Sequence, residues 1–501
     1  MEDSRREFLK RSGCALGMAA LATQMRHFGM MEAMAQKAID ADRGIEGGEN
    51  YKALVLVFWS GGNDGNNIVV PNHNDATISN YATYANIRNA SGLAVPQASL
   101  LPIAVPRLGG LSYGLHPSFG PVTGGINNGI HELWAQQKMA IVTNCGTLVR
   151  PMLRSQYLNN SVQKPYQLFS HSDQVAQYQT SISNTQAFTG WGGRLSDRLT
   201  PGQNPNGLIP MVTSIAGAQL FTAGQTTLPM AIAQANNTGT PNLANVLNPA
   251  GFNTTTASQA RLTAFNQLRT VDLDSNFVAA ASHVTDLAMQ ANAALQTSQE
   301  VTAVFQNTGI GLQLKQVARL IKKRLELNVN RQIFYVQIGG FDTHNGQVTG
   351  QSNLISQFSQ AARAFYDEMV MQNAQNDVTL FTLSDFGRTL TPAGSSAGVV
   401  GSDHAWGNHM FAIGGSVLGG DFYGNTRPDG SGNIYPTLTP GGPDDTDTGT
   451  GPRGRWIPTT SVEQYANTMA KWFGLPQDAP TLAGVFPNIG NFATQSLGFL
   501  P

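Results

Sequence analysis

The chain has 501 residues, a formal net charge of −1 and only 12% charged residues. This balance excludes nucleic-acid binding by phosphate neutralisation, which requires a basic surface. An apolar content of 41% excludes a disordered chain, and the length allows one large α/β domain with insertions, or two domains.

The N-terminus has the pattern of an export signal. Arg5 and Arg6 have the spacing of a twin-arginine signal, a short apolar stretch covers residues 14–22, and small residues before Gln36 offer a cleavage site. The alternative is an ordinary basic amphipathic helix. Because the apolar stretch is too short to span a bilayer stably, we expect no transmembrane anchor in the mature protein.

We therefore expect a signal peptide at residues 1–35, a linker at 36–50 and an α/β domain at 51–501. The expected partner is the twin-arginine translocation machinery, and the expected location is the periplasm or the extracellular space. This route carries folded proteins, which often load a metal in the cytoplasm, so it weakly favours a metalloprotein.

The domain opens with an apolar run of strand length at residues 51–59, and a segment rich in Gly and Asn that contains Asp64 follows at once. A carboxylate at the C-terminal end of a strand can be a metal ligand. The alternative is a turn residue, because Asn-Asp-Gly is a strong turn sequence. Residues 115–137 are predicted to form a helix and 139–144 a strand, which gives a β-α-β arrangement.

A Ser-His-Ser-Asp sequence at 170–173 opens the next predicted helix. A hydroxyl at a helix N-terminus could be a nucleophile, since the helix dipole favours an anion there, and this makes Ser170 a candidate. The alternative is that Ser170 or Ser172 is simply an N-cap.

Residues 200–310 differ in composition from their surroundings, being rich in Ala, Gln, Asn and Thr with few charges. They predict an insertion or cap, with short strands near 210–232 and helices over 256–297. An amphipathic helix follows at 311–327.

The next predicted strand covers residues 331–338, and Asp342 and His344 follow its end. Two such residues could project to the same side and share one cation. The alternative is that Asp342 caps the following helix, which is predicted at 354–371.

A buried strand at 378–383 stops at Asp385 and Arg388, and a Gly- and Ser-rich loop then leads to His404 and His409. This local concentration of titratable residues is the main functional signal in the chain. Arg388 could grip a tetrahedral oxyanion with its planar guanidinium; equally, it could only pair with Asp385. A further strand at 410–413 and a helix that opens with a capping box near residue 461 follow.

Carboxylates and imidazoles thus follow three predicted strands that are far apart in the sequence. In a parallel sheet the carboxyl ends of the strands share one edge, so these side chains could converge. The candidates are Asp64, Asp342, His344, Asp385 and His404. Mixed carboxylate and imidazole ligands suit zinc, manganese or a similar divalent ion, and two such ions could polarise an ester oxyanion and activate a nucleophile.

Four motifs give a specific resemblance to a known family. They are FWSGGNDGNN at 58–67, GFDTH at 340–344, SDFGRT at 384–389 and DHAWGN at 403–408. With the twin-arginine start, they make most of residues 51–480 resemble the exported bacterial family filed as domain of unknown function 1501. That family is similar to the alkaline phosphatase/sulfatase superfamily, whose members hydrolyse phosphate or sulfate esters with one or two divalent metals.

The resemblance implies an alkaline-phosphatase-like three-layer α/β sandwich with a central, mostly parallel sheet and an inserted cap. It implies that Asp64 and Asp385 bind one metal ion, and that the other is bound by Asp342, His344 and His404. It also places Ser170 nearest to the superfamily's nucleophile position.

The chain departs from the superfamily pattern at Phe386, where a histidine is common, and it lacks the Cys/Ser-x-Pro-x-Arg signature of formylglycine-type sulfatases. We expect an exported metal-dependent hydrolase of phosphate or sulfate esters, with Ser170 and Arg388 as catalytic residues and one or two divalent ions. Its substrate would be a small-molecule or polymer ester. The alternative is a non-catalytic exported binding or surface-assembly protein that keeps the fold.

Overall fold

The structure is a computed structural model. It describes residues 50–236, 255–269, 300–394 and 399–501, together with single positions and runs of two or three residues between 271 and 295. The expected signal peptide at 1–35, the linker except residue 50, and part of the helical region expected at 256–297 lie outside the described residues. Within the described ranges, no helix is both long enough and apolar enough to cross a membrane.

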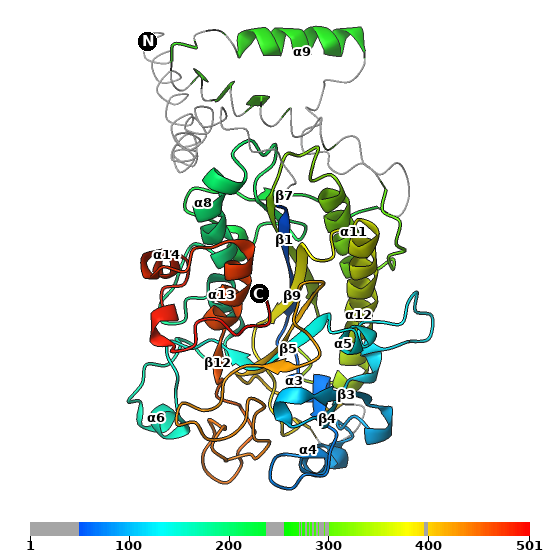
Figure 1. The fold of residues 1–501 in the computed structure, drawn as a ribbon, viewed down its shortest axis with the longest axis vertical. Helices are drawn as coiled ribbons and strands as arrows, with labels where there is room; N and C mark the ends of the chain where they lie inside the picture. The colour runs from blue at the N-terminus through cyan, green and yellow to red at the C-terminus, as the bar shows by residue number, and fades with distance from the viewer. Residues whose placement is uncertain are drawn as a thin grey trace, which may run out of the picture.

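A mixed, mostly parallel sheet forms the centre of the fold and lies between two layers of helices (Figure 1). In the part of the chain that the structure describes, its strands are, in spatial order, β11 (Phe422–Tyr423), β5 (Met139–Gly146), β10 (Asn408–Gly414), β9 (Val378–Ser384), β1 (Lys52–Ser60), β8 (Arg331–Gly339), β6 (Val212–Ser214) and β7 (Met230–Ala231), with β12 (Thr460–Ser461) also paired to β5. Strand β10 is antiparallel to both neighbours, and the other pairs in this sheet are parallel. The expected α/β class with a mostly parallel central sheet is confirmed.

The two helical layers cover opposite faces of the sheet. One contains α11 (Gly309–Lys322) and α12 (Gln347–Met371), and the other contains α7 (His171–Thr180), α8 (Trp191–Gln203), α13 (Val462–Phe473) and α14 (Ala479–Val485). Val55 and Val57 of β1 belong to the core under the first layer, whereas Leu54 and Leu56 belong to the core under the second. Because β1 is buried on both faces, its sequence is a continuous apolar run without alternation.

Most predicted elements near the candidate residues are confirmed, namely β1, β8, β9, β10, α11, α12 and α13. Helix α13 opens with the expected capping box at Ser461. Helix α12 begins earlier than predicted, and its N-cap is Gly346. The alternative role of Asp342 as the cap of this helix is therefore wrong.

The helix predicted at 115–137 is also wrong. Strand β4 (Leu111–Leu115) ends there, in a small sheet with β2 (Val69–Pro71) and β3 (Leu101–Val105), and α5 (Glu132–Ala135) gives only one turn later. The segment between them is fixed as a loop, because Oε1 of Gln360 in α12 accepts two of its backbone N–H groups at 2.8 and 3.0 Å.

The region expected to be an insertion begins inside the main sheet. Its short strands β6 and β7 were predicted, and they extend the sheet beyond β8 through parallel pairing. Helix α9 (Thr256–Leu268) also lies where a helix was expected.

The carboxyl ends of β8, β1 and β9 lie side by side. Trp59 near the end of β1 is in register with Ile338 of β8 and with Ser384 of β9. The segments that follow these three strands therefore leave the sheet at one edge, as the sequence predicted.

Candidate metal centre

Three histidines and one aspartate converge at this edge of the sheet. The Nε2 atoms of His344 and His404 are 3.0 Å apart, and those of His171 and His404 are 3.1 Å apart. Oδ1 of Asp342 lies 3.1 Å from Nε2 of His344 and 3.5 Å from Nε2 of each of the other two histidines. Four side chains from three segments of the chain thus direct a potential ligand atom to one point.

The second nitrogen of each imidazole is held by an oxygen acceptor. Nδ1 of His171 lies 2.8 Å from Oδ2 of Asp385, Nδ1 of His344 lies 3.2 Å from Oδ1 of Asp403, and Nδ1 of His404 lies 2.9 Å from the carbonyl oxygen of Phe169. Since these oxygens accept hydrogen bonds, each Nδ1 carries the proton in a neutral ring and each Nε2 keeps its lone pair. Metal-binding histidines are oriented in this way.

The distances and the donor chemistry fit a divalent transition metal. Bonds of about 2.0–2.1 Å in a tetrahedral zinc site place neighbouring ligand atoms about 3.3 Å apart. The five distances given above are 3.0–3.5 Å, and one ligand atom each from His171, Asp342 and His404 lies within 4.8 Å of the others. Imidazole nitrogen combined with carboxylate oxygen suits zinc, manganese or iron. His171, Asp342, His344 and His404 are therefore the residues that could hold such an ion.

Two glycines after β1 allow these segments to pack together. Gly61 has a φ of +118°, and a Cβ there would lie 2.4 Å from the backbone nitrogen of Asp342. Gly62 has a φ of +77°, and a Cβ there would overlap the ring of Phe386. The N–H of Gly61 also donates to Oδ1 of Asp385 at 3.0 Å. Both oxygens of Asp385 thus have partners, the second being Nδ1 of His171.

Arg388 lies against Asp342 and is fully buried. Its guanidinium donates to three backbone carbonyl oxygens at 2.7–2.8 Å and to Oδ1 of Asp342. An ion pair was one of the two sequence interpretations, but the partner is Asp342 and not Asp385. Burial raises the pKa of Asp342, but the hydrogen bond and positive charge of Arg388 outweigh this effect, so the net pKa is lowered and Asp342 stays ionised.

The pKa values of two of the imidazoles are shifted in opposite directions. The hydrogen bond to Asp385 raises the pKa of His171. Burial lowers the pKa of His404, and the nearby His171 and Arg388 lower it further. His404 therefore remains neutral to a lower pH, which favours a metal-binding role because only the neutral ring can bind.

A cleft of about 410 Å³ opens beside the cluster. It is lined by Ser60, Gly61, His171, Ser172, Val175, Gly340, Asp342 and Asp385. His171 and Ser172 belong to the first turn of α7, so the positive end of that helix dipole is at the cleft.

Comparison with known proteins gives a family. A model described as "Protein of unknown function (DUF1501)" matches residues 51–464. The chain belongs to the DUF1501 family. No curated protein matches it. Among solved structures, it is similar to the PsFucS1 sulfatase from Pseudoalteromonas sp., with 9% identity, 78% of this chain and 68% of that chain covered, and a TM-score of 0.23.

The predicted metal ligands of this DUF1501 protein have three different placements. Asp342, His344 and His404 meet in the cluster. Asp385 stands behind His171, which it orients through Nδ1. The structure therefore brings together the second of the two ligand sets that the family resemblance implied, with His171 added.

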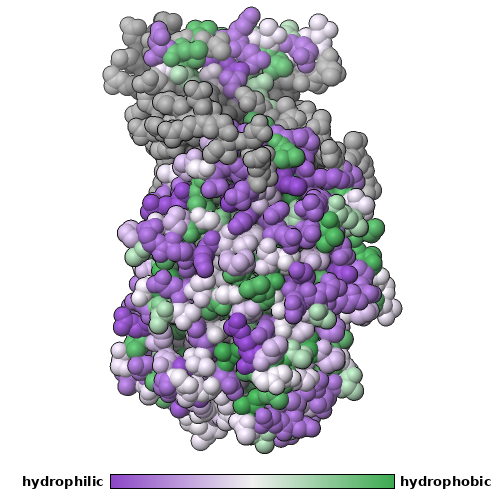
Figure 2. All heavy atoms as spheres, in the orientation of Figure 1, coloured by the Kyte–Doolittle hydropathy of each residue, from purple (hydrophilic) through white to green (hydrophobic). Residues whose placement is uncertain are grey.

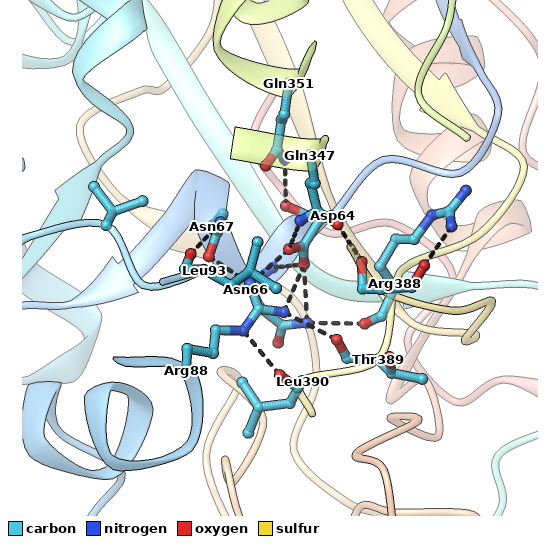
Figure 3. A network of polar contacts seen from close by, with 12 residues as sticks. Asp64, Asn66, Asn67, Arg88, Leu93, Gln347, Gln351, Arg388, Thr389 and Leu390 are labelled. Carbon is cyan, nitrogen blue, oxygen red and sulfur yellow. Dashed lines mark hydrogen bonds and ion pairs between the residues drawn. The ribbon is translucent and has the colours of Figure 1, made fainter. Parts of the chain in front are cut away.

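Asp64 lies in a buried polar network (Figure 3). Its Oδ2 is 2.6 Å from Nη1 of Arg88, and both side chains are completely buried. The carboxylate also accepts Nε2–H of Gln347 at 2.5 Å and the backbone N–H of Asn66 at 3.1 Å. The partner of this carboxylate is therefore the guanidinium of Arg88, and not the histidine cluster.

Ser170 occupies the N-cap position of α7, as the alternative interpretation proposed, although its side chain caps no backbone N–H. Its hydroxyl donates to Oδ2 of Asp173 at 2.6 Å. The next serine in the sequence, Ser172, lines the cleft, and Ser170 does not.

Sequence reasoning missed His171. The residue stands inside the Ser-His-Ser-Asp sequence, but that segment was considered for its hydroxyl groups. The usable signal was a histidine at the first position of a helix, near a predicted anion site. His409 is not in the cluster: it is buried in β10, stacks on Tyr435 with ring centroids 5.1 Å apart, and burial lowers its pKa to about 3.

Proposed function

We propose that this DUF1501 protein is a metal-dependent hydrolase of phosphate or sulfate esters. The observation that carries the proposal is that Oδ1 of Asp342 and the Nε2 atoms of His344 and His404 lie 3.0–3.5 Å apart, with Nε2 of His171 3.1 Å from that of His404. A divalent ion bound there would supply Lewis-acid chemistry towards an ester oxygen.

We assign the ion to Asp342, His344 and His404. The distances among their ligand atoms are 3.0, 3.1 and 3.5 Å, whereas those among His171, Asp342 and His404 are 3.1, 3.5 and 3.5 Å. Three protein ligands leave a fourth position open, which is the arrangement of catalytic zinc sites. His171 faces that position from the first turn of α7.

His171 and Asp385 would then act as a proton-transfer pair. Asp385 holds the Nδ1 proton of His171 and fixes the ring, which leaves Nε2 to accept a proton from an attacking water or to return it to the leaving group. Arg388 would not touch the substrate, because it is buried and its contacts hold Asp342 in place.

An anionic ester fits the surroundings of this position. The positive end of α7, a bound cation and a cleft without an acidic side chain other than Asp342 and Asp385 favour an anion. The motif resemblance narrows the anion to a phosphate or sulfate ester, from a small molecule or a polymer.

One observation favours a second candidate function. His171 also offers a ligand atom, since one such atom each from His171, Asp342 and His404 lies within 4.8 Å of the others, and an ion bound by these three together with His344 would have no open position. Such an ion would be structural, and the protein would then be a non-catalytic exported binding or surface-assembly protein.

Metal content and turnover of aryl phosphate and aryl sulfate esters separate the two functions. We expect His404→Gln to lose both the ion and turnover. We expect His171→Gln to keep the ion and to lose about 100-fold or more of turnover, since general acid–base catalysis contributes at least this much. His131→Gln is the matched control, because the ring of His131 lies outside the cluster and its Nε2 is 3.1 Å from the carbonyl oxygen of Pro102. If His171→Gln loses the ion as His404→Gln does, and the wild type has no turnover, the site is closed and the second function holds.

We also propose that the protein is exported by the twin-arginine route to the periplasm or beyond. The pattern around Arg5 and Arg6 supports this. A double Arg5→Lys, Arg6→Lys variant should remain in the cytoplasm of the producing cell, as fractionation would show, and unchanged export would contradict the proposal.

A further inference from the structure

Asp64 and Arg88 form a buried ion pair (Figure 3). The guanidinium of Arg88 is surrounded by oxygen atoms, as a bound metal cation would be. The guanidinium of Arg88 lies 2.6 and 3.2 Å from the two carboxylate oxygens of Asp64. It also donates to the carbonyl oxygens of Thr389 and Leu390, each at 2.9 Å, and to Oδ1 of Asn67. All of these partners are oxygen atoms, the kind that hard metal cations take as ligands.

These contacts connect Asp64 and Arg88 to the segment that carries Asp385 and Arg388. The carbonyl groups that Arg88 binds belong to the two residues directly after Arg388. The side chain of Asn66 adds a hydrogen bond to the carbonyl oxygen of Arg388 at 2.8 Å.

A second connection leads to the segments that carry His344 and His404. Gln347, the first residue of α12, donates to Oδ2 of Asp64 at 2.5 Å, and its Oε1 accepts the hydroxyl of Ser402 at 2.5 Å. Gln347 follows His344 by three residues, and Ser402 precedes His404 by two. The ion pair therefore has hydrogen-bonded links to all the segments after β8 and β9 that build the histidine cluster.

We infer that Arg88 is a positioning residue that takes the place of a second metal ion at Asp64, and that the centre therefore holds one ion. A bare carboxylate at Asp64 would be buried without a counter-charge, which is costly. The guanidinium supplies that charge, and its planar fork of donors fixes several oxygen atoms at once, which a single ammonium group does not. The single-ion part of this inference rests on the proposed function.

The test compares Arg88→Ala with Arg331→Ala. Arg331 is a matched control, because it is also a buried arginine that donates to backbone carbonyls, but at the opposite end of the sheet, at the start of β8. We expect the wild type to bind one equivalent of zinc or manganese. Arg88→Ala should bind it about 10–100-fold more weakly, as for other outer-shell changes at metal sites, and Arg331→Ala should not. Two equivalents in the wild type, or equal losses in the two variants, would overturn the inference.

The decisive experiment is to add guanidinium ion at millimolar concentration to the two variants and to measure metal affinity again. It should restore metal affinity to Arg88→Ala by refilling the oxygen-lined space, and it should not affect Arg331→Ala. Arg88→Lys serves where Arg88→Ala fails to fold: it keeps the charge but not the fork of donors, so we expect it to fold and to bind metal more weakly than the wild type. Wild-type affinity in Arg88→Lys would show that only the charge matters and would contradict a positioning role.

A metal-independent measurement separates this inference from the proposed function. Without metal, backbone hydrogen exchange in residues 384–390 and 402–408 should be at least tenfold faster in Arg88→Ala, should return towards the wild-type rate with guanidinium, and should stay unchanged in Arg331→Ala. If the wild type binds no metal, the proposed function fails, and this exchange pattern still decides the positioning role. Unchanged exchange in Arg88→Ala would refute it.

Discussion

Asp342 and Asp64 follow neighbouring strands of one sheet, and each is paired with a buried arginine, yet their environments differ. The side chain of Asp342 is 47% exposed, and its Oδ1 faces three imidazole nitrogens that carry lone pairs. Asp64 is completely buried, and hydrogen-bond donors surround its carboxylate. The comparison teaches that a carboxylate at a strand end is a candidate metal ligand only when the groups around it can also bind a metal ion. Where hydrogen-bond donors surround it, they already satisfy its oxygen atoms.

The largest effect should come from neutralising the two aspartates in turn. Asp64→Asn leaves Arg88 buried without a counter-charge, which typically costs about 3–5 kcal/mol of the free energy of unfolding. Asp342→Asn also leaves a buried arginine, but it should cost less, because the Asp342 side chain is 47% exposed and Arg388 keeps three backbone carbonyl partners. Denaturant unfolding without metal measures both values, and equal losses would erase the distinction between the two carboxylates.

Metal affinity should separate the same two variants in the opposite sense. Asp342→Asn removes a proposed ligand, so its loss should exceed the roughly 100-fold that marks the upper end of outer-shell changes. Asp64→Asn should stay at or below that figure. Isothermal titration with zinc and manganese gives both numbers, and a weaker affinity for Asp64→Asn than for Asp342→Asn would return Asp64 to the list of ligands.

A smaller effect is expected from the carboxylates behind the histidines. Asp385→Asn and Asp403→Asn remove the charged partners of Nδ1 in His171 and His344, and each should lower metal affinity about 10-fold. Asp75→Asn is the control, because Asp75 lies outside the cluster and its side chain accepts hydrogen bonds from nearby Thr77. Unchanged affinity in both test variants would mean that ring orientation does not depend on these contacts.

The smallest effect concerns pH in the metal-free protein. Because the pKa of His171 is raised in the folded state, its pairing with Asp385 contributes stability that is fully present below the unfolded pKa of about 6.5 and is lost as the pH rises through the folded value. The side chain of His171 is 34% exposed, so the contribution should stay below about 1 kcal/mol. Urea unfolding with a chelator should show a larger gap between wild type and His171→Gln at pH 5.5 than at pH 8.5. An equal gap at both values would show that the pair does not stabilise the fold.

The sequence predicted well where the strands end, but it predicted poorly which side chains contact the residues that follow them. The apolar runs of β1, β8 and β9 are unambiguous, so the placement of Asp342 and His344 at one edge with His404 could be inferred. The partner of Asp64 could not be inferred, because Arg88 is the last residue of a short helix of mixed composition, α4 (Tyr81–Arg88), and nothing in that sequence predicts that the arginine is completely buried.

Long separation along the chain explains the other failures. His171 lies 214 residues before Asp385, and no local pattern links an imidazole to a carboxylate at that distance. The loop at 115–137 takes its structure from the side chain of Gln360 in α12, more than 230 residues later. Hydrophobic periodicity predicts a single helix or strand, whereas these features depend on contacts with residues that are distant in the sequence.

The face of the molecule in Figure 2 gives no comparable signal among the described residues. Figure 2 shows polar and apolar residues mixed across the face in view, with apolar side chains scattered in small groups. Scattered exposed apolar residues are normal for a folded protein and mark no particular partner.

The imidazoles of His171 and His404 meet although 233 residues separate them. During synthesis, the pocket for an ion would stay incomplete until the segment that carries His404 has emerged from the ribosome. A bound ion would therefore indicate that translation has continued past β10, and a product terminated before His404 would not bind the ion at this site.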